Sequence, residues 1–337
     1  MSFKVLGLNK PIVKAILEKG YEAPTQVQEQ AIPAILNKKD IIVTAQTGTG
    51  KTAAYALPIL QLLFDKQDAP KRSKKIKALI VSPTRELADQ IAINFKDYSH
   101  FTNLRSTVVF GGTSIEPQKE ILNKGVDILI ATPGRLLDLH KQEIIHLDQV
   151  SILVIDEADL MLDMGFIDDV NKIERLCPET KQTLLFSATF PYKVEQLAKS
   201  ILKEPKKIAI TPKTTTANGV EQVLYFVPKP KKIELCLHVL RNHIKGQIII
   251  FRRTKFGVDK LEKTLLKNNY KVATLHGDKS QSARQQALNS FKKKEVAILI
   301  ATDVAARGID VERLDAVINF DLPNIPETYV HIDHVYT

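Results

Sequence analysis

The sequence predicts an α/β protein of two domains, each a parallel β-sheet flanked by helices. Short runs rich in Val, Ile and Leu alternate with amphipathic stretches of helical length. Such runs are typical of strands that are buried on both faces in βαβ units. The length of 337 residues exceeds what one ordinary core accommodates and fits two domains.

The predicted strands fall into two series along the chain. The first series is 40–43, 78–81, 106–110, 128–131, 152–155, 183–186 and 207–210, and the second is 222–227, 247–251, 271–275, 296–301 and 315–320. Between them, residues 211–219 are polar, contain Pro212 and Gly219, and lack an apolar period, which predicts a linker. The expected domains are therefore residues 1–210 and 220–337.

The composition is that of a soluble globular protein with an excess of positive charge. Hydrophobic residues make up 44% and charged residues 26% of the chain. Lys and Arg number 48 against 38 Asp and Glu, a formal net charge of +10. This excess favours a polyanionic partner such as nucleic acid, although a Lys-rich surface can also serve solubility alone.

Cysteine usage and apolar runs point to a reducing cytoplasm. Cys177 and Cys236 lie far apart and share no metal-ligand spacing, so neither a disulfide framework nor a zinc site is expected. The start, MSFKVLGLNK, has no apolar core of a signal peptide. Apolar runs such as 296–301 are too short to span a bilayer, which predicts no membrane partner.

A phosphate-binding loop is predicted directly after the first strand. Glycines there let backbone N–H groups approach phosphate oxygens, and a helix N-terminus adds positive partial charge. Lys51 is expected to reach the β- and γ-phosphates, and the Thr52 hydroxyl to bind Mg²⁺. Ala45 replaces the usual first glycine, which is tolerable if that position needs no positive φ. The expected nucleotide loop is Ala45, Gln46, Thr47, Gly48, Thr49, Gly50, Lys51 and Thr52.

Two acidic residues follow the buried run 152–155. An acid at the end of a buried strand is costly without a cationic partner, and Mg²⁺ held by Asp156 is the expected one. Glu157 is placed to orient or deprotonate the attacking water. The alternative is that these acids cap the next helix, a role that Asp159 partly fills. The expected catalytic residues are Lys51, Asp156 and Glu157.

The loop AQTGTGKT together with the string DEAD resembles the DEAD-box RNA helicase family, and further matches cover nearly all of the chain. The resemblance implies two RecA-like domains, ATP with Mg²⁺, and RNA as the partner. Residues 20–28 look like the family's Q motif, and Phe3 sits at its upstream aromatic position. By resemblance, Gln28 hydrogen-bonds the adenine edge, which suits its amide donors and acceptor, and Tyr21 stacks on the ring.

Three loops after successive strands match the family's RNA-binding loops. They contain Pro83, Thr84 and Arg85, then Gly111 and Gly112, then Thr132, Pro133, Gly134 and Arg135. The resemblance implies that they hold the sugar–phosphate backbone of single-stranded RNA, so binding is expected to tolerate sequence and to depend on salt. Ordinary Pro- and Gly-containing turns are the alternative for any single loop, and Arg85 could instead pair with Glu86.

Further matches concern coupling and the second domain. Ser187, Ala188 and Thr189 look like the family segment that links the ATP and RNA sites. Residues 301–310 look like motif V, which implies that Thr302 contacts RNA phosphate, Asp310 bonds the ATP ribose and Arg307 lies near the cleft as a coupling residue. An ion pair between Asp303 and Arg307 is compatible with this. The run 161–166 resembles the bacterial RhlE-type subgroup.

The chain departs from the family pattern near its end. Ile332 and Val335 stand where the family has the first two arginines of motif VI, which reach the γ-phosphate. An arginine finger contributes about 10³–10⁵ in rate to phosphoryl transfer. The sequence therefore predicts a second domain that is incomplete, with a truncation, a frame slip and a real variant as open explanations.

Two functions follow from these residues. The first is an RNA-stimulated ATPase that separates short duplexes when the cleft between the domains closes on ATP and RNA. The second is a crippled helicase that binds ATP and RNA but hydrolyses almost nothing. A DNA helicase or transporter ATPase fits the Q-motif match poorly. The resemblance implies a cytoplasmic monomer that acts on ribosomal precursors or decaying messengers, with proteins of ribosome assembly or RNA decay as partners.

Overall fold

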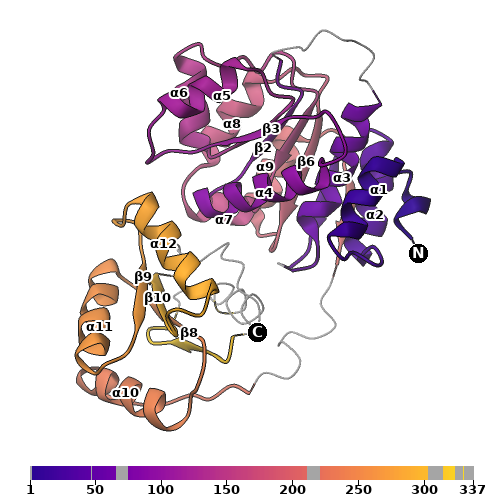
Figure 1. Cartoon of the computed structure of the whole chain (residues 1–337). Helices are drawn as coiled ribbons and strands as arrows, with labels where there is room; N and C mark the ends of the chain where they lie inside the picture. The colour runs from indigo at the N-terminus through magenta and orange to yellow at the C-terminus, as the bar shows by residue number, and fades with distance from the viewer. Residues whose placement is uncertain are drawn as a thin grey trace. The chain divides into compact units, whose positions relative to one another are not determined.

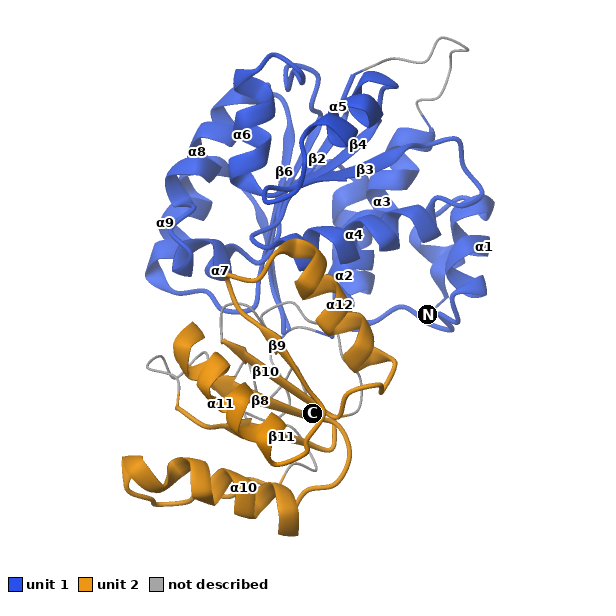
Figure 2. Cartoon of the chain, turned by 60° about the vertical axis from the view of Figure 1, so that its left-hand side comes forward, with its two compact units in different colours: residues 1–212 blue, residues 213–337 orange. Residues whose placement is uncertain are grey.

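The chain folds into two compact units, residues 1–212 and 213–337, which Figure 2 shows in different colours. The computed structural model describes residues 2–46, 48–65, 75–210, 221–302, 314–322 and 329. The predicted linker 211–219 lies outside these residues. In the described parts, every helix is too short or too polar to cross a bilayer.

Unit 1 contains a parallel sheet of seven strands within its described residues, in the order β3-β4-β2-β5-β6-β1-β7. The strands are β1 (Ile41–Thr44), β2 (Ala78–Val81), β3 (Ser106–Val109), β4 (Ile128–Ala131), β5 (Ile152–Ile155), β6 (Gln182–Ser187) and β7 (Lys206–Ala209). The helices are η1 (Phe3–Leu6), α1 (Lys10–Glu18), α2 (Gln26–Leu36), α3 (Lys51–Phe64), α4 (Arg85–Tyr98), α5 (Glu116–Asn123), α6 (Pro133–Lys141), α7 (Ala158–Asp163), α8 (Ile167–Leu176) and α9 (Tyr192–Ile201).

Helices cover both faces of this sheet, because successive strand residues point to opposite sides (Figure 1). In β5, Ile152 and Val154 pack in one apolar core with α1 to α4, whereas Leu153 and Ile155 pack in a second core with α5 to α9. Full burial of each such side chain contributes about 1.5–3 kcal/mol. The continuous apolar runs of the sequence thus reflect two cores that share one sheet.

Unit 2 is built on the same plan with a smaller sheet. Its described strands are β8 (Ile248–Arg252), β9 (Val272–Leu275), β10 (Ile298–Thr302) and β11 (Ala316–Asn319), parallel and in the order β11-β8-β10-β9. The helices are η2 (Lys229–Lys231), α10 (Lys232–Asn242), α11 (Lys255–Lys267) and α12 (Gln281–Lys292). Helices α10 and α11 pack on one face of the sheet and α12 on the other. The α/β class with parallel sheets is confirmed.

One predicted strand is wrong. Residues 221–228 belong to no helix or strand, although 222–227 has the apolar composition of a strand. Within the described residues no neighbouring strand pairs with this segment, and Phe226 is 92% exposed. An apolar run becomes a strand only when a partner supplies its hydrogen bonds.

Candidate functional site

The candidate residues of unit 1 gather at one edge of its sheet. Those after β1, β2, β3, β4, β5 and β6 all follow the carboxyl ends of their strands, and the strand pairs are all parallel. Residues that are far apart in sequence therefore meet at this carboxyl edge. In open α/β sheets this is the edge where ligands bind.

The loop after β1 has the backbone of a phosphate-binding turn. Gly48 and Gly50 adopt φ angles of 80° and 88°, in the left-handed region that favours glycine. Helix α3 begins at Lys51, so its free N–H groups point toward the loop. Ala45 has no positive φ and donates to the Ser187 carbonyl at 3.1 Å, which explains why alanine suffices there. Thr47 lies outside the described residues.

Lys51 and Glu157 form a buried ion pair at the start of α3. The Nζ–Oε1 distance is 2.7 Å, and the side chains are 6% and 9% exposed. Burial raises the pKa of Glu157 to about 7, against the opposing pull of Lys51. Burial alone would lower the pKa of Lys51, but the carboxylates of Glu157 and Asp156 outweigh it and raise that pKa. The pair thus places an ammonium group, that of Lys51, and a carboxylate, that of Glu157, next to the glycine loop.

Asp156 lies beside this pair with both carboxylate oxygens bound by the chain. Its Oδ1 accepts from the Glu157 N–H at 3.1 Å, and its Oδ2 accepts from the Tyr55 hydroxyl at 3.0 Å. Burial raises the pKa of Asp156, and the Lys51 charge opposes that rise. Glu157 itself adopts φ 51°, a left-handed conformation that is rare for a residue with a side chain. The turn after β5 is thereby held in one geometry.

Asp159 connects this turn to the segment after β6. Its Oδ2 accepts from the backbone N–H and the hydroxyl of Thr189, both at 2.8 Å, and its N–H donates to the Ser187 hydroxyl at 3.2 Å. Burial would raise the pKa of Asp159, but Lys51 and the bonds from Thr189 and Ser187 lower it overall. The sequence predicts only a partial capping role for Asp159. Nothing in its position along the chain indicated this bond.

The Q-motif region binds the phosphate loop from outside. Thr25 and Gln28 form a capping box at the start of α2. The Gln28 Nε2 donates to the Gly50 carbonyl at 3.2 Å, and the Thr25 hydroxyl donates to the Thr49 carbonyl at 2.8 Å. A Cβ on Gly50 would lie 2.5 Å from Gln28 Nε2. Gln28 is therefore a neighbour of the loop that is expected to hold the triphosphate.

Tyr21 lies in a largely buried aromatic group of the same region. Its ring stacks on Phe3, with centroids 6.4 Å apart, and its hydroxyl shares a 2.8 Å hydrogen bond with the Tyr98 hydroxyl. Tyr21 is partly buried. The ring is held in position by these two contacts, while its stacking on a base stays a prediction.

The remaining loops of the edge, after β2 and β3, also meet one another. Thr84 caps α4 by accepting from Leu87 N–H at 3.3 Å, and Arg85 follows it. A Cβ built on Gly112, whose φ is 75°, would overlap the Arg85 guanidinium. The guanidinium therefore lies against the glycine doublet.

The loop after β4 also contacts the segment of the glycine doublet. Thr132 precedes Pro133, the first residue of α6, and Arg135 lies in the first turn. Arg135 donates to the Thr113 backbone carbonyl at 3.0 Å, directly after the doublet. Gln118 bonds both backbone groups of Phe110, directly before it. The sequence did not indicate that Arg135 and Gln118 hold this loop, because their partners are main-chain atoms.

Comparison with known proteins identifies the architecture. A family model described as "DEAD/DEAH box helicase" matches residues 25–197, and a model described as "Helicase conserved C-terminal domain" matches residues 231–333. The chain belongs to the DEAD-box RNA helicase family. The predicted family is confirmed, while the placement near RhlE-type members stays a prediction.

Individual relatives in this DEAD-box family support the same conclusion. The chain is 42% identical over 330 residues to the DEAD-box ATP-dependent RNA helicase RhpA of Helicobacter pylori, covering 98% of this chain and 66% of RhpA. It is 42% identical over 331 residues to the ATP-dependent RNA helicase DeaD of Escherichia coli, covering 98% and 52%. The chain thus spans about two thirds of the length of the first and about half of the second.

Solved DEAD-box structures share the fold. Saccharomyces cerevisiae Dbp5 bound to RNA and ADP BeF3 superposes with a TM-score of 0.88 at 31% identity, over 99% of this chain and 86% of that one. Mss116p bound to ssRNA and AMP-PNP has a TM-score of 0.88 at 31% identity, over 98% and 70%.

The oxygen donors of this DEAD-box site suit Mg²⁺. Asp156 is a carboxylate only 4% exposed, and its two oxygens can accept about four bonds, of which the chain supplies the two given above. Thr52, next to Lys51, adds a hydroxyl. Within the described residues no group of three or more His, Cys, Asp or Glu forms a metal cage. Mg²⁺ needs none, since it is usually bound by one or two carboxylates, phosphates and water.

In unit 2, the structure describes only part of the DEAD-box candidate set. Thr302 is the last residue of β10, at the carboxyl end of a central strand. Arg307 and Asp310 lie outside the described residues, as do Ile332 and Val335.

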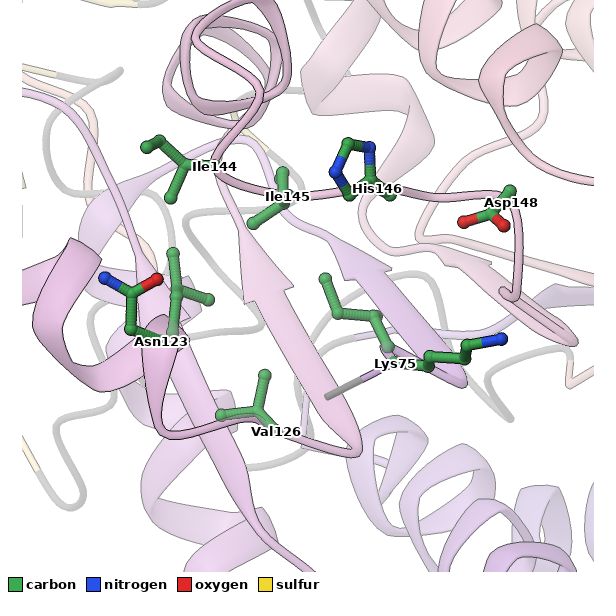
Figure 3. A pocket seen from close by; sticks show the side chains of 9 residues that line it. Lys75, Asn123, Val126, Ile144, Ile145, His146 and Asp148 are labelled. Atoms are coloured by element: carbon green, nitrogen blue, oxygen red, sulfur yellow. The ribbon is translucent and has the colours of Figure 1, made fainter. Parts of the chain in front are cut away.

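A pocket of about 380 Å³ opens at the opposite edge of the unit 1 sheet and is separate from the DEAD-box site (Figure 3). Its lining residues precede β2, β4 and β5, at the amino ends of those strands. They are Lys75, Ile76, Leu122, Asn123, Val126, Ile144, Ile145, His146 and Asp148. None of the candidate site residues lines this pocket.

Proposed function

We propose that this chain binds ATP with Mg²⁺ in unit 1, hydrolyses it, and uses the cycle to grip and locally separate RNA strands. The observation that carries the proposal is the buried pair of Lys51 and Glu157, with Asp156 beside it, at the start of α3 behind the glycine loop. A buried lysine and two carboxylates are costly to assemble and suit an exchange of partners with a charged ligand.

The nucleotide is bound by the loop and by the capping region. Backbone N–H groups of the glycine loop and the N-terminus of α3 face the phosphates. Gln28, already at the loop, bonds the adenine edge, and Tyr21 stacks on the ring. Asp310 bonds the ribose. Thr52 and Asp156 hold Mg²⁺, which neutralises the charge that develops on the phosphate oxygens.

Hydrolysis then follows from an exchange at Lys51. The ammonium moves from Glu157 to the β- and γ-phosphates, which leaves the Glu157 carboxylate free to face the attacking water. The freed, buried carboxylate is well suited to take the proton of the attacking water while the water oxygen bonds phosphorus and ADP leaves. Burial keeps bulk water from competing for this proton.

RNA is held by the other loops of the same edge. Thr84 and Thr132, with Pro83, Pro133 and Gly134 around them, present hydroxyls and main-chain groups to the sugar–phosphate backbone. Arg85 and Arg135 add positive charge next to the doublet of Gly111 and Gly112. Thr302 of unit 2 contacts phosphate as well. Since such contacts read no bases, binding tolerates sequence and weakens with salt.

Signals between the two ligands pass through the bond network after β5 and β6. Asp159 lies in the same acidic turn as Glu157, and it hydrogen-bonds Thr189 and Ser187 directly. Ser187, Ala188 and Thr189 therefore move with the acidic turn, and Arg307 of unit 2 completes the coupling. We place this activity in the cytoplasm.

The test is ATP binding and RNA-stimulated phosphate release by the whole chain. Lys51→Ala should abolish ATP binding, because no other described side chain replaces the ammonium at the loop. Glu157→Gln should keep binding and remove hydrolysis. Full ATP affinity in Lys51→Ala would contradict the assignment of the phosphate site.

A second candidate, a chain that binds ATP and RNA but hydrolyses slowly, is favoured by one observation. Ile332 and Val335 stand where the family has arginines. Changing both to Arg should then raise phosphate release without changing ATP affinity. Turnover that does not rise in the double variant would reject this second candidate.

A further inference from the structure

Tyr55 is a fully buried tyrosine on α3 for which the proposed mechanism has no role. It lies four residues after Lys51, one helical turn along the same face. Its exposed fraction is 0%, and its ring packs against Phe186 at 5.0 Å between centroids and against Phe95 at 6.3 Å. A phenylalanine ring would fill this apolar space equally well, so packing does not account for the hydroxyl.

The hydroxyl has a specific partner. It donates to Asp156 Oδ2 at 3.0 Å, while the Glu157 N–H donates to Oδ1 at 3.1 Å. One donor on each oxygen fixes the plane of the carboxylate and leaves the remaining lone pairs of both oxygens for a cation. A buried hydroxyl without a partner is costly, so the position suits a tyrosine because the Asp156 carboxylate accepts this bond and the Thr52 side chain is a second hydrogen-bond partner.

We propose that Tyr55 is a positioning residue that holds the Asp156 carboxylate in the orientation in which it binds the Mg²⁺ of Mg²⁺–ATP. The inference rests on the proposed function, in which Asp156 is the carboxylate that holds Mg²⁺. Mg²⁺ tolerates little departure from octahedral geometry, so a carboxylate free to rotate binds it poorly. Hydrogen bonds to a metal ligand from behind act in this way, and their loss typically costs about 10–100-fold in metal affinity or activity.

The experiment compares the wild type with Tyr55→Phe, which removes a single oxygen atom from the buried ring. The readout is the affinity for a fluorescent ATP analogue, measured first in EDTA and then across a Mg²⁺ titration. Affinity in EDTA should change by less than about twofold, because the loop and Lys51 are intact. The Mg²⁺ concentration for half-maximal enhancement should rise about tenfold.

Two further variants separate this role from a general loosening of unit 1. Ser99→Ala removes another buried hydroxyl, which donates to the Lys96 carbonyl at 3.3 Å at the far end of α4, and should leave the Mg²⁺ requirement unchanged. In an Asp156→Asn background, adding Tyr55→Phe should change the Mg²⁺ requirement much less than in the wild type, because the part of the effect that passes through Asp156 is gone and only the contact with Thr52 remains.

Each outcome decides one question. A Mg²⁺ requirement in Tyr55→Phe equal to that of the wild type would overturn the role of Tyr55, as would an equal rise in the Asp156→Asn background. If Asp156→Asn alone leaves the Mg²⁺ dependence unchanged, the metal assignment of the proposed function fails instead. Thermal unfolding of each ligand-free variant establishes that the compared proteins are folded.

Discussion

The two halves of the carboxyl edge of unit 1 hold their charges in different ways. Around β1, β5 and β6, Lys51 and Glu157 neutralise each other in a buried pair. Around β3, β4 and β2, the Arg135 guanidinium donates to the main-chain carbonyl of Thr113. Its Nε lies 3.9 Å from the Asp138 carboxylate, a long ion pair. A bond to a neutral carbonyl leaves the positive charge in place.

This difference separates two kinds of ligand binding. In the half proposed to bind nucleotide, a ligand must exchange partners with an existing ion pair, so we expect its binding to depend on pH and on Mg²⁺. In the arginine half, Arg135 has a long 3.9 Å ion pair with the half-exposed Asp138 carboxylate besides its carbonyl bond, so a phosphate chain adds to its neutralisation and we expect binding to depend on salt. The following predictions, from the largest expected effect to the smallest, test this division.

The largest effect is expected from glycine substitutions in the two halves. Gly50→Ala combines left-handed backbone strain with a collision against Gln28, which is 2% exposed and fixed by the capping box. We expect it to cost about 4 kcal/mol in the free energy of unfolding. Gly112→Ala meets the flexible end of Arg85 and should cost about 2 kcal/mol, mainly from strain. Urea unfolding of both variants measures the loss in free energy of unfolding. Equal losses for Gly50→Ala and Gly112→Ala would contradict the expected difference between the two halves.

A second prediction concerns pH and Glu157. Burial raises its pKa from 4.5 to about 7, so the folded protein keeps a proton that the unfolded chain releases. The resulting stabilisation is complete below pH 4.5 and is lost as the pH rises through about 7, a change of about 3 kcal/mol. Glu157→Gln resembles the protonated form and should lack this loss. Urea unfolding from pH 5 to 8 tests it, and parallel pH profiles for the two proteins would contradict it.

A third prediction concerns the hydrogen bonds between Asp159 and Thr189, which join the acidic turn after β5 to the segment after β6. Asp159→Ala removes both acceptor bonds to Thr189 and should cost about 2 kcal/mol in stability. Because the link from the acidic turn to Thr189 is lost, RNA should no longer stimulate ATP hydrolysis, while ATP affinity stays near that of the wild type. Thr189→Val removes only the hydroxyl bond and should show about half the loss. Intact RNA stimulation in Asp159→Ala would argue against this route of coupling.

The smallest effect is expected at Arg135. Arg135→Ala removes the bond to the Thr113 carbonyl and should weaken RNA binding by about 1 kcal/mol by loosening the glycine doublet. Because the guanidinium also supplies one positive charge to the phosphate chain, the slope of log affinity against log salt should decrease by about 0.7. An unchanged slope would show instead that Arg135 serves the loop alone.

The sequence was most informative where a residue type in a given motif has few alternative structural roles. The structure has Gly48, Gly50, Lys51 and Asp156 at the carboxyl ends of parallel strands, a location that the strand–loop–helix pattern indicates, while their roles stay predictions. Tyr55 could have been found from its four-residue spacing to Lys51, but its apolar surroundings made it look like core. The strand predicted at 222–227 failed because pairing, not composition, makes a strand.

Contacts to main-chain atoms were beyond sequence reasoning. Arg135 with the Thr113 carbonyl and Gln28 with the Gly50 carbonyl depend on the path of the backbone, which any residue type can supply. The Asp159–Thr189 bond joins residues 30 positions apart through the adjacency of β5 and β6. Such bonds follow from sheet order, which a single sequence does not specify.

The edge strand β7 has a mechanical consequence. It is the last strand of unit 1 before the chain enters unit 2, and it pairs in parallel with β1, which leads directly into the phosphate loop. Tension applied to the chain beyond Ala209 acts along β7. It therefore loads the hydrogen bonds between β7 and β1 in shear, all at the same time, rather than breaking them one after another. A pull between the units thus acts one strand away from the loop proposed to bind phosphate, and the pairing of β7 with β1 breaks only when several hydrogen bonds break at once.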